Sequence, residues 1–162
     1  MKTIIIYYSL EGNTESVAKK IAKELDADLL HLEPVKAYPS EGGRKYFWGG
    51  KAVIQKDAPE LLPFDLPLEE YDHVILGTPV WASSFAPPFR TLLQRYDMTG
   101  KKVSVFACQA GNGAQKCFEK LLELLPIDKF DSQMILIDPL KKPDSSNDVM
   151  IKGFCDEIKK DC

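Results

Sequence analysis

Residues 2–14 read KTIIIYYSLEGNT and contain two patterns in succession. The first, residues 2–8, is a nearly continuous run of aliphatic and aromatic side chains, which is typical of a strand buried on both faces of a parallel sheet. A polar turn with a glycine follows, and then Val17, Ile21 and Leu25 recur at the spacing of a helical face. The stretch therefore predicts a strand, a short turn and a helix, which is how a βαβ unit begins.

The same alternation of strand and helix patterns continues along the chain. Further apolar runs predict strands at residues 28–33, 73–77, 102–108 and 133–138. Helical periodicity fills the gaps, with apolar positions at Phe89, Leu92, Leu93 and Tyr96 after Pro87-Pro88, at Phe118, Leu121, Leu122 and Leu125 before Pro126, and at Ile151, Phe154, Cys155 and Ile158. Five parallel strands with right-handed crossovers predict an α/β fold: an open, doubly wound parallel sheet with helices on both faces.

The crossover between residues 34 and 67 departs from this regularity. It contains several prolines and two Gly-Gly pairs, so we expect a short interrupted helix and long loops there. Its aromatic cluster, Tyr46, Phe47 and Trp48, is expected to pack on the edge of the sheet.

Size and composition are those of a globular protein. The chain has 162 residues, 44% hydrophobic and 28% charged, which predicts a single domain at residues 1–162. A formal charge of −3 argues against a nucleic-acid partner, because neutralising phosphates requires a strongly basic face. No apolar run has the length of a membrane span or the form of a signal peptide, so we expect a cytoplasmic protein. Cys108, Cys117, Cys155 and Cys162 lack metal-site or disulfide-framework spacing and are expected to be reduced thiols.

Three polar segments follow predicted strands and are expected to meet. They are residues 9–14, 78–84 and 109–113, and ligands of doubly wound sheets bind where such loops converge at the carboxyl ends of the strands. The first segment offers hydroxyls, a glycine and backbone N–H groups at the positive end of a helix, which suits a phosphate. The alternative is that Thr14 only caps the helix and Gly12 only makes the turn.

Other chemistries that use such loops lack the residues they require. Neither a Gly-Lys-Ser/Thr ending nor a GxGxxG turn is present, which excludes the common nucleotide loops. The first loop has no cysteine to serve as a phosphatase nucleophile, and the first and third strands do not end in the aspartates of a receiver domain. His31 and His73 lie within or at the start of predicted strands, so both are expected to be structural. We therefore expect no metal site and no catalytic side chain.

The three loops together resemble those of the flavodoxin family. Residues 8–15, YSLEGNTE, resemble the flavodoxin phosphate loop. Residues 77–82, GTPVWA, with residues 86–88, resemble the flavin-ring loop of the short bacterial flavodoxin-like FMN proteins, and residues 106–114, FACQAGNGA, resemble their third, glycine-rich loop. The resemblance implies a flavodoxin-like sheet of order 2-1-3-4-5 and flavin mononucleotide (FMN) as the cofactor.

The resemblance also implies which residues bind FMN. The first loop would hold the phosphate, the second would line the ribityl chain and the ring, and the third would flank the other edge of the ring. These residues are Ser9, Leu10, Glu11, Gly12, Asn13 and Thr14 in the first loop, Thr78, Pro79, Val80 and Trp81 in the second, and Gln109, Ala110 and Gly111 in the third.

Some of these positions depart from the family pattern or allow two interpretations. Glu11 stands where the family has a second hydroxyl, and we expect its side chain to turn outward because it would repel a phosphate. Trp81 would give the ring an aromatic surface, the alternative being a tryptophan that caps the core. Gln109 is either a ring neighbour or an ordinary polar loop residue. Residues 109–113 contain no aromatic residue, so the ring would be stacked on one side only.

The sequence leaves three functions open. The first is an electron carrier, in which FMN performs the redox chemistry and the partners are redox proteins or a small-molecule electron acceptor. The second is an FMN-dependent reductase that passes hydride from NAD(P)H to a quinone or nitro compound. The third is an interaction module of the same fold that has lost the cofactor, for which Glu11 is the only support.

Overall fold

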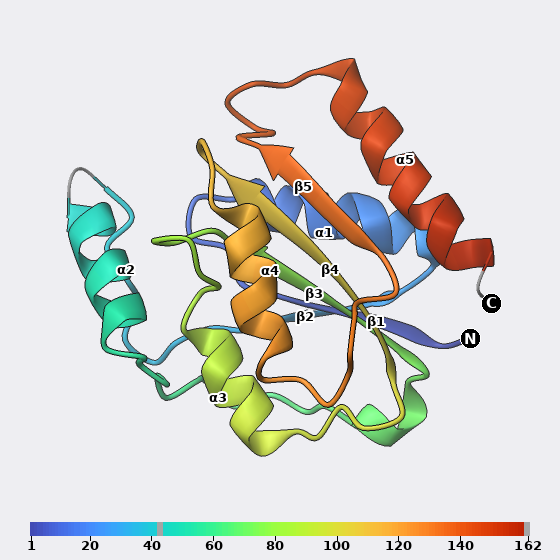
Figure 1. Ribbon diagram of the computed structural model, residues 1–162, viewed down its shortest axis with the longest axis horizontal. Helices are drawn as coiled ribbons and strands as arrows, with labels where there is room; N and C mark the ends of the chain where they lie inside the picture. Colours follow the sequence, from blue (N-terminus) through green and yellow to red (C-terminus); the bar gives the residue numbers. More distant parts are fainter. Residues whose placement is uncertain (42–43, 161–162) are drawn as a thin grey trace.

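The computed structural model describes residues 1–41 and 44–160, and the side chains within them except those of residues 45–47. Its centre is a five-stranded parallel sheet in the order β2-β1-β3-β4-β5, with helices on both faces (Figure 1). The strands are β1 (Thr3–Tyr7), β2 (Asp28–His31), β3 (His73–Pro79), β4 (Lys102–Gln109) and β5 (Gln133–Ile137). The helices are α1 (Asn13–Leu25), α2 (Arg44–Ile54), α3 (Pro88–Arg95), α4 (Ala114–Leu122) and α5 (Ser145–Lys160), with a 3-10 turn η1 at Leu68–Glu70. The expected fold class and strand order are confirmed.

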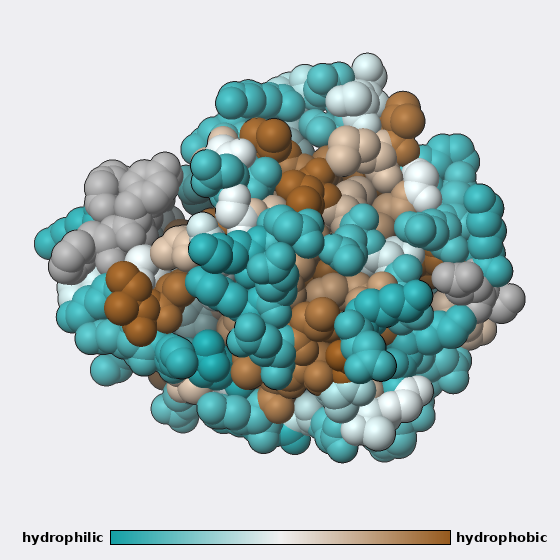
Figure 2. All heavy atoms as spheres, viewed as in Figure 1, coloured by the Kyte–Doolittle hydropathy of each residue, from teal (hydrophilic) through white to brown (hydrophobic). Residues whose placement is uncertain are grey.

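Alternate residues of the buried strands point into two separate cores. Ile4 and Ile6 of β1 pack in the core that includes α3 and α4, whereas Ile5 and Tyr7 pack in the core that includes α1 and α5. This two-sided burial explains why the strand is apolar without alternation. Hydrophilic residues cover most of the face seen in Figure 2, and hydrophobic ones show between them. Within the described residues, no helix combines the length and the apolar character needed to cross a bilayer.

The register of the central strands depends on a glycine in β3. Gly77 pairs with Tyr7 of β1 on one side and with Phe106 of β4 on the other. A Cβ atom at Gly77 would lie 2.6 Å from Cε1 of the fully buried Phe106 ring, so the ring occupies the space that a side chain would need. In this parallel register β3 and β4 extend beyond the end of β1, to Pro79 and Gln109, and the loops that follow the three strands begin at the same edge of the sheet.

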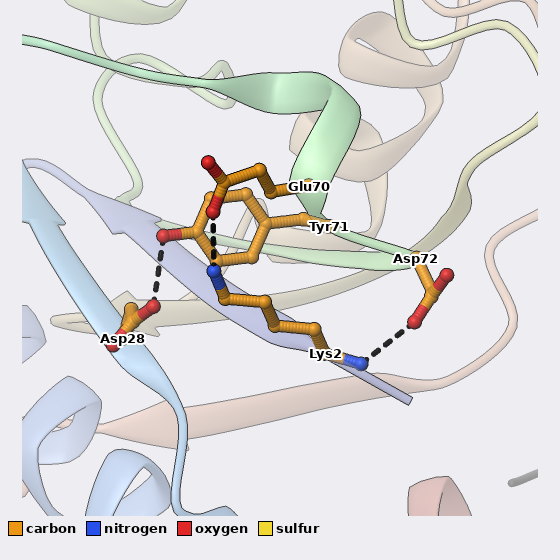
Figure 3. A network of polar contacts seen from close by, with 5 residues as sticks. All are labelled: Lys2, Asp28, Glu70, Tyr71 and Asp72. Atoms are coloured by element: carbon orange, nitrogen blue, oxygen red, sulfur yellow. Dashed lines mark hydrogen bonds and ion pairs between the residues drawn. The ribbon is translucent and has the colours of Figure 1, made fainter.

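A polar network closes the opposite edge, at the amino ends of β1 and β2 (Figure 3). The backbone N–H of Lys2 donates to Asp72 Oδ2 at 2.7 Å, and the ammonium of the same residue lies 2.6 Å from Glu70 Oε2. The Tyr71 hydroxyl donates to Asp28 Oδ2 at 2.8 Å, and Lys2 Nζ lies 4.7 Å from the centre of the Tyr71 ring. The network fixes the end of the long crossover to the start of the sheet.

The structure places both histidines in the packing of the sheet. The His31 ring stacks on Tyr7 with ring centres 4.8 Å apart and an interplanar angle of 2°. His73 is buried at the start of β3, where its Nε2 lies 2.9 Å from Ser104 Oγ. Neither side chain lines the cavity at the carboxyl ends of the strands.

The long crossover has the short helix and the loops that the sequence predicts. Its chain leaves and returns through an antiparallel bridge between Pro34 and Leu61, and α2 lies between them, to one side of the sheet (Figure 1). The expectation that the aromatic cluster packs on the sheet edge is wrong for Trp48, which is 44% exposed and has Lys51 Nζ 4.9 Å from its ring centre. The side chains of Tyr46 and Phe47 lie outside the described residues.

Helix α4 ends earlier than its apolar pattern indicates. The periodicity runs to Leu125, but the helix stops at Leu122, and tighter turns carry the chain from there to Pro126. In these turns Leu124 and Leu125 donate to the carbonyls of Leu121 and Leu122, three residues back, at 3.1 and 3.0 Å. A residue before proline is disfavoured in helical conformation, which accounts for the early end while Leu125 stays buried.

Replacement of Gly77 tests the close contact with Phe106. We expect Gly77→Ala to lower the free energy of unfolding by about 1–3 kcal/mol, because the added methyl group overpacks a core without space for it. Urea unfolding followed by circular dichroism measures the change. The double variant Gly77→Ala/Phe106→Leu should recover part of the loss, whereas a single variant as stable as the wild type would contradict the packing described.

Candidate functional site

A cavity of about 340 Å³ lies where the loops after β1, β3 and β4 meet. This volume is within the range of small-molecule sites. All three segments expected from the sequence contribute to it, through Ser9, Leu10, Glu11, Asn13, Thr14, Pro79, Val80, Trp81, Ala82, Gln109 and Ala110. The remaining lining residues were not expected: Gly49 and Gly50 of α2, Cys108 at the end of β4, and Asp138 and Lys141 after β5.

The loop after β1 presents a helix end to this cavity. Helix α1 begins after Gly12, whose φ of 95° lies in the left-handed region that glycine favours, and no side chain caps the helix. The Ser9 hydroxyl accepts the Gly12 N–H at 3.1 Å, and the Asn13 side chain accepts the Leu140 N–H at 2.9 Å. These bonds hold the loop in place and leave the N–H groups of the first helical turn without a side-chain acceptor. Such a helix end binds anions.

Thr14 supplies a polar atom that needs a partner. Thr14 is 1% exposed, and its hydroxyl oxygen makes no hydrogen bond of regular geometry within the described part of the chain. The helix is preceded by Gly12 and not by Thr14, so the hydroxyl does not serve as the N-cap. Buried hydroxyls without partners are uncommon in folded proteins, and this one lines the cavity, which makes it a candidate ligand contact.

Cys108 is the next-to-last residue of β4, and its thiol neighbours the Thr14 hydroxyl. Burial raises the pKa of its thiol to about 12, and the neighbouring Thr14 hydroxyl opposes this only in part. Cys117 and Cys155 are also buried free thiols, and burial raises their pKa values to about 12 and about 11. The expectation of reduced cysteines is met at these three positions, while Cys162 lies outside the described residues.

Glu11 and Lys141 face each other at the cavity. Lys141 Nζ lies 3.7 Å from Glu11 Oε1, and the Glu11 side chain is 34% exposed. The lysine comes from the segment after β5, outside the three segments that the sequence predicts at the site. It places a positive charge beside the carboxylate that departs from the family pattern.

Trp81 belongs both to the cavity and to a cluster of aromatic rings. Its ring meets those of Tyr8 and Tyr38 edge to face, with centres 5.6 and 5.3 Å apart and interplanar angles of 90° and 82°. Burial raises the pKa of both tyrosines, that of Tyr38 to about 12, so their hydroxyls stay protonated at neutral pH. The two interpretations of Trp81 are thus compatible: it lines the cavity and packs against the core.

The turn after Trp81 has an unusual backbone. Trp81 and Ser84 exchange two backbone hydrogen bonds of 2.9 Å, and the residues between them, Ala82 and Ser83, have φ values of 48° and 56°. Two positive φ angles in a two-residue turn define the type I′ conformation, which favours Asn and Gly. A Cβ atom on Gly113 would lie 2.7 Å from Ser83 Oγ, so the turn packs tightly on the loop before α4.

Three of the expected site residues do not line the cavity. Gly12 makes the turn before α1, and Gly111 is exposed. Thr78 is fully buried, where its hydroxyl donates to the Pro79 carbonyl at 2.8 Å and accepts the Ala86 N–H at 3.0 Å. Thr78 therefore fixes the shape of the loop and offers no free group to a ligand.

Gln109 both caps a helix and lines the cavity. Its side-chain oxygen accepts the Ala114 N–H at 3.0 Å, so it caps α4, and it also lines the cavity. Among the residues that the structure describes, no group of histidine, cysteine and acidic side chains could hold a metal ion.

Doubly wound sheets bind ligands where the strand order reverses, and flavodoxins are the type example with the switch between β1 and β3. The cavity lies at that switch, so the molecule falls in the flavodoxin-like class of α/β proteins. The chain belongs to the Flavodoxin family, whose model matches residues 2–149.

Individual relatives agree with this assignment. A flavodoxin from Haemophilus influenzae is 27% identical over 108 residues, which cover 64% of this chain and 48% of that protein. The flavoprotein of Lactobacillus acidophilus, solved in complex with FMN, is 26% identical and covers 86% of this chain and 95% of its own, with a TM-score of 0.69. Oxidised Flavodoxin 2 from Bacillus cereus shares the fold over the full length of both chains, 100% of each, at 21% identity and a TM-score of 0.62.

The positive φ angles of the turn after Trp81 can be tested by substitution. We expect Ala82→Gly to raise the free energy of unfolding by up to about 1 kcal/mol, because glycine adopts this conformation without the steric cost that alanine has. Ala82→Val should lower it, since a β-branched side chain is disfavoured at positive φ. Urea unfolding measures the free energy of unfolding of both variants. A less stable Ala82→Gly together with a more stable Ala82→Val would exclude the type I′ turn.

Proposed function

We propose that this chain binds FMN at the carboxyl edge of its sheet and serves as an electron-transfer protein. The observation that carries the proposal is the buried Thr14 hydroxyl, which has no regular partner and lies in the first turn of an uncapped helix. A phosphate oxygen beside this helix end would accept hydrogen bonds from the hydroxyl and from the backbone N–H groups. The FMN complex of the Lactobacillus acidophilus relative supports the choice of ligand.

The other residues of the cavity suit the rest of such a ligand. Pro79, Val80 and Trp81 give an apolar and aromatic surface on one side, and Ala110 lies on the loop across from them. Planar aromatic ligands bind to surfaces of this kind. Bound FMN supplies one-electron and two-electron chemistry, while the residues of the chain hold it and exclude water from it.

The thiol in the cavity lining is unsuited to acid–base chemistry at neutral pH. A general acid or base works best with a pKa near the pH of the reaction. The ionisable side chains in the lining are those of Glu11, Cys108, Asp138 and Lys141, and burial holds the pKa of Cys108 far above neutrality. An electron carrier requires no such group. Its partners would be redox proteins or a small-molecule electron acceptor.

Absorbance spectroscopy and a rate measurement test the proposal. Purified protein mixed with FMN and separated from free ligand should show a bound flavin spectrum, and protein that stays colourless would favour an interaction module. Bound flavin reduced chemically should pass electrons to an acceptor protein or dye, with negligible steady oxidation of NAD(P)H. Rapid, sustained NAD(P)H oxidation with a quinone or nitro compound would instead identify a reductase.

The Thr14 hydroxyl should discriminate FMN from riboflavin, which lacks the phosphate. We expect the wild type to bind FMN more tightly than riboflavin, and Thr14→Ala to weaken FMN by about 1–3 kcal/mol, the size of a hydrogen bond to a charged group. Fluorescence titration gives both dissociation constants. Thr14→Ser keeps the hydroxyl and should stay close to the wild type. Equal loss of FMN and riboflavin in Thr14→Ala would indicate damage to the fold and would remove the phosphate assignment.

Lys141 should compensate the charge of Glu11 when FMN binds. We expect Lys141→Gln to weaken FMN several-fold at low salt with no effect on riboflavin, because the phosphate then meets an uncompensated carboxylate. Glu11→Gln should change FMN affinity little in the wild type but restore it in Lys141→Gln. Lys142→Gln is the matched control, since this neighbouring lysine is exposed and does not line the cavity. Equal effects of the two lysine variants would exclude a specific role for Lys141.

A further inference from the structure

Among the side chains that the structure describes, none from helix α2 lines the cavity, and the helix contributes backbone there. Gly49 and Gly50 are its two residues in the lining, and neither has a side chain to offer. All other lining residues lie at the carboxyl ends of strands or in the loops and first helical turn that follow them. The long crossover therefore adds a wall that the sequence resemblance to flavodoxin loops does not include.

The two glycines have different surroundings. A Cβ atom at Gly49 would lie 3.2 Å from Cε3 and 3.3 Å from Cδ2 of Trp81, so the helix backbone lies directly against this ring. Of the atoms that the structure describes, none would lie within 4 Å of a Cβ atom at Gly50, although Gly50 lines the cavity. The next residue, Lys51, places its ammonium over the exposed Trp48 ring. Helix α2 thus has a bare strip of backbone at the cavity.

A glycine pair inside a helix lowers the stability of that helix, and no contact described for Gly50 compensates for this loss. Each glycine destabilises a helix interior by roughly 0.5–1 kcal/mol relative to alanine. At Gly49 a Cβ atom would crowd the Trp81 ring, whereas at Gly50 no described atom occupies the space that one would need. The absence of a side chain at Gly50 is explained if a planar ligand ring lies close to the helix backbone there.

We propose that α2 forms a wall of the flavin-ring site and that the backbone at Gly50 is its contact surface. The inference rests on the proposed FMN function and extends it to a part of the chain outside the three loops. A planar ring that enters beside Trp81 meets the side-chain-free backbone of α2, which supplies the second boundary that residues 109–113 cannot give with an aromatic side chain. Close approach to backbone is a common reason for glycine at a ligand site.

Substitutions at Gly50 separate this role from helix stability. We expect Gly50→Ala to raise the melting temperature of the flavin-free protein by about 1–4 °C, because it improves helix propensity without a clash. Gly50→Leu keeps a good helix former but fills the cavity, and it should weaken FMN and riboflavin alike by at least about ten-fold. Gly153→Ala is the matched control: it lies in α5, its Cβ also meets nothing within 4 Å, and it should stabilise the protein with unchanged flavin affinity.

The outcomes distinguish this inference from the proposed function. Thermal melts and circular dichroism establish that each variant is folded, and fluorescence titration gives the two dissociation constants. If folded Gly50→Leu binds both flavins as the wild type does, α2 does not contact the ring, and FMN binding itself stands. If it weakens FMN but not riboflavin, α2 contacts the phosphate end and the ring assignment is overturned. If the wild type binds neither flavin, the proposed function fails and this inference fails with it.

Discussion

The parallel pairing of β1, β3 and β4 is the constraint on which the site depends. Because Gly77 pairs with Tyr7 and with Phe106, these parallel strands all end at one edge of the sheet, and the three loops that leave them share one small region. Loop backbone in such a region needs hydrogen-bond partners. The loops find many of them in side chains of the same region: Ser9 holds Gly12, and Thr78 holds Ala86.

The division between paired and unpaired groups gives the site its two ends. At one end α1 has no side-chain cap, and the Thr14 hydroxyl makes no hydrogen bond of regular geometry within the described residues, which makes this end electropositive and polar. At the other end Trp81 packs edge to face with two tyrosine rings and lies against the α2 backbone, so it presents a fixed apolar surface. A ligand with a charged group and a flat apolar group, joined by a flexible chain, matches both ends.

The sequence predicted the fold well because its signals are local and strong. Strands buried on both faces must be continuously apolar, and in a parallel sheet the loops after them must converge, so residues 9–14, 78–84 and 109–113 could be placed together. The sequence carries no comparable local signal for segments that reach the cavity from distant parts of the chain. Nothing in residues 49–50 or at Lys141 indicates that these segments reach the same cavity, because their positions follow from how the crossover and the segment after β5 fold back.

The remaining differences between the sequence expectations and the structure arise from the local surroundings of single residues. Trp48 is apolar enough to be expected against the sheet, yet α2 stands to one side and leaves it exposed. Leu125 keeps the helical spacing but precedes a proline, so the chain changes to tighter turns there. Thr78 and Gln109 were identified by type and position, while their roles in bracing the loop and capping α4 depend on partners that spacing alone does not reveal.

The bridge at the base of the long crossover bears on how the protein opens. Val35 donates to the Glu60 carbonyl at 2.8 Å and Leu62 donates to the Glu33 carbonyl at 2.7 Å, so the chain between them is closed at its base. A segment tied in this way is able to unfold locally while the strands stay intact, at a free energy below that of global unfolding. Helix α2 would then behave as a separate cooperative unit whose amide protons exchange before those of β1 and β3.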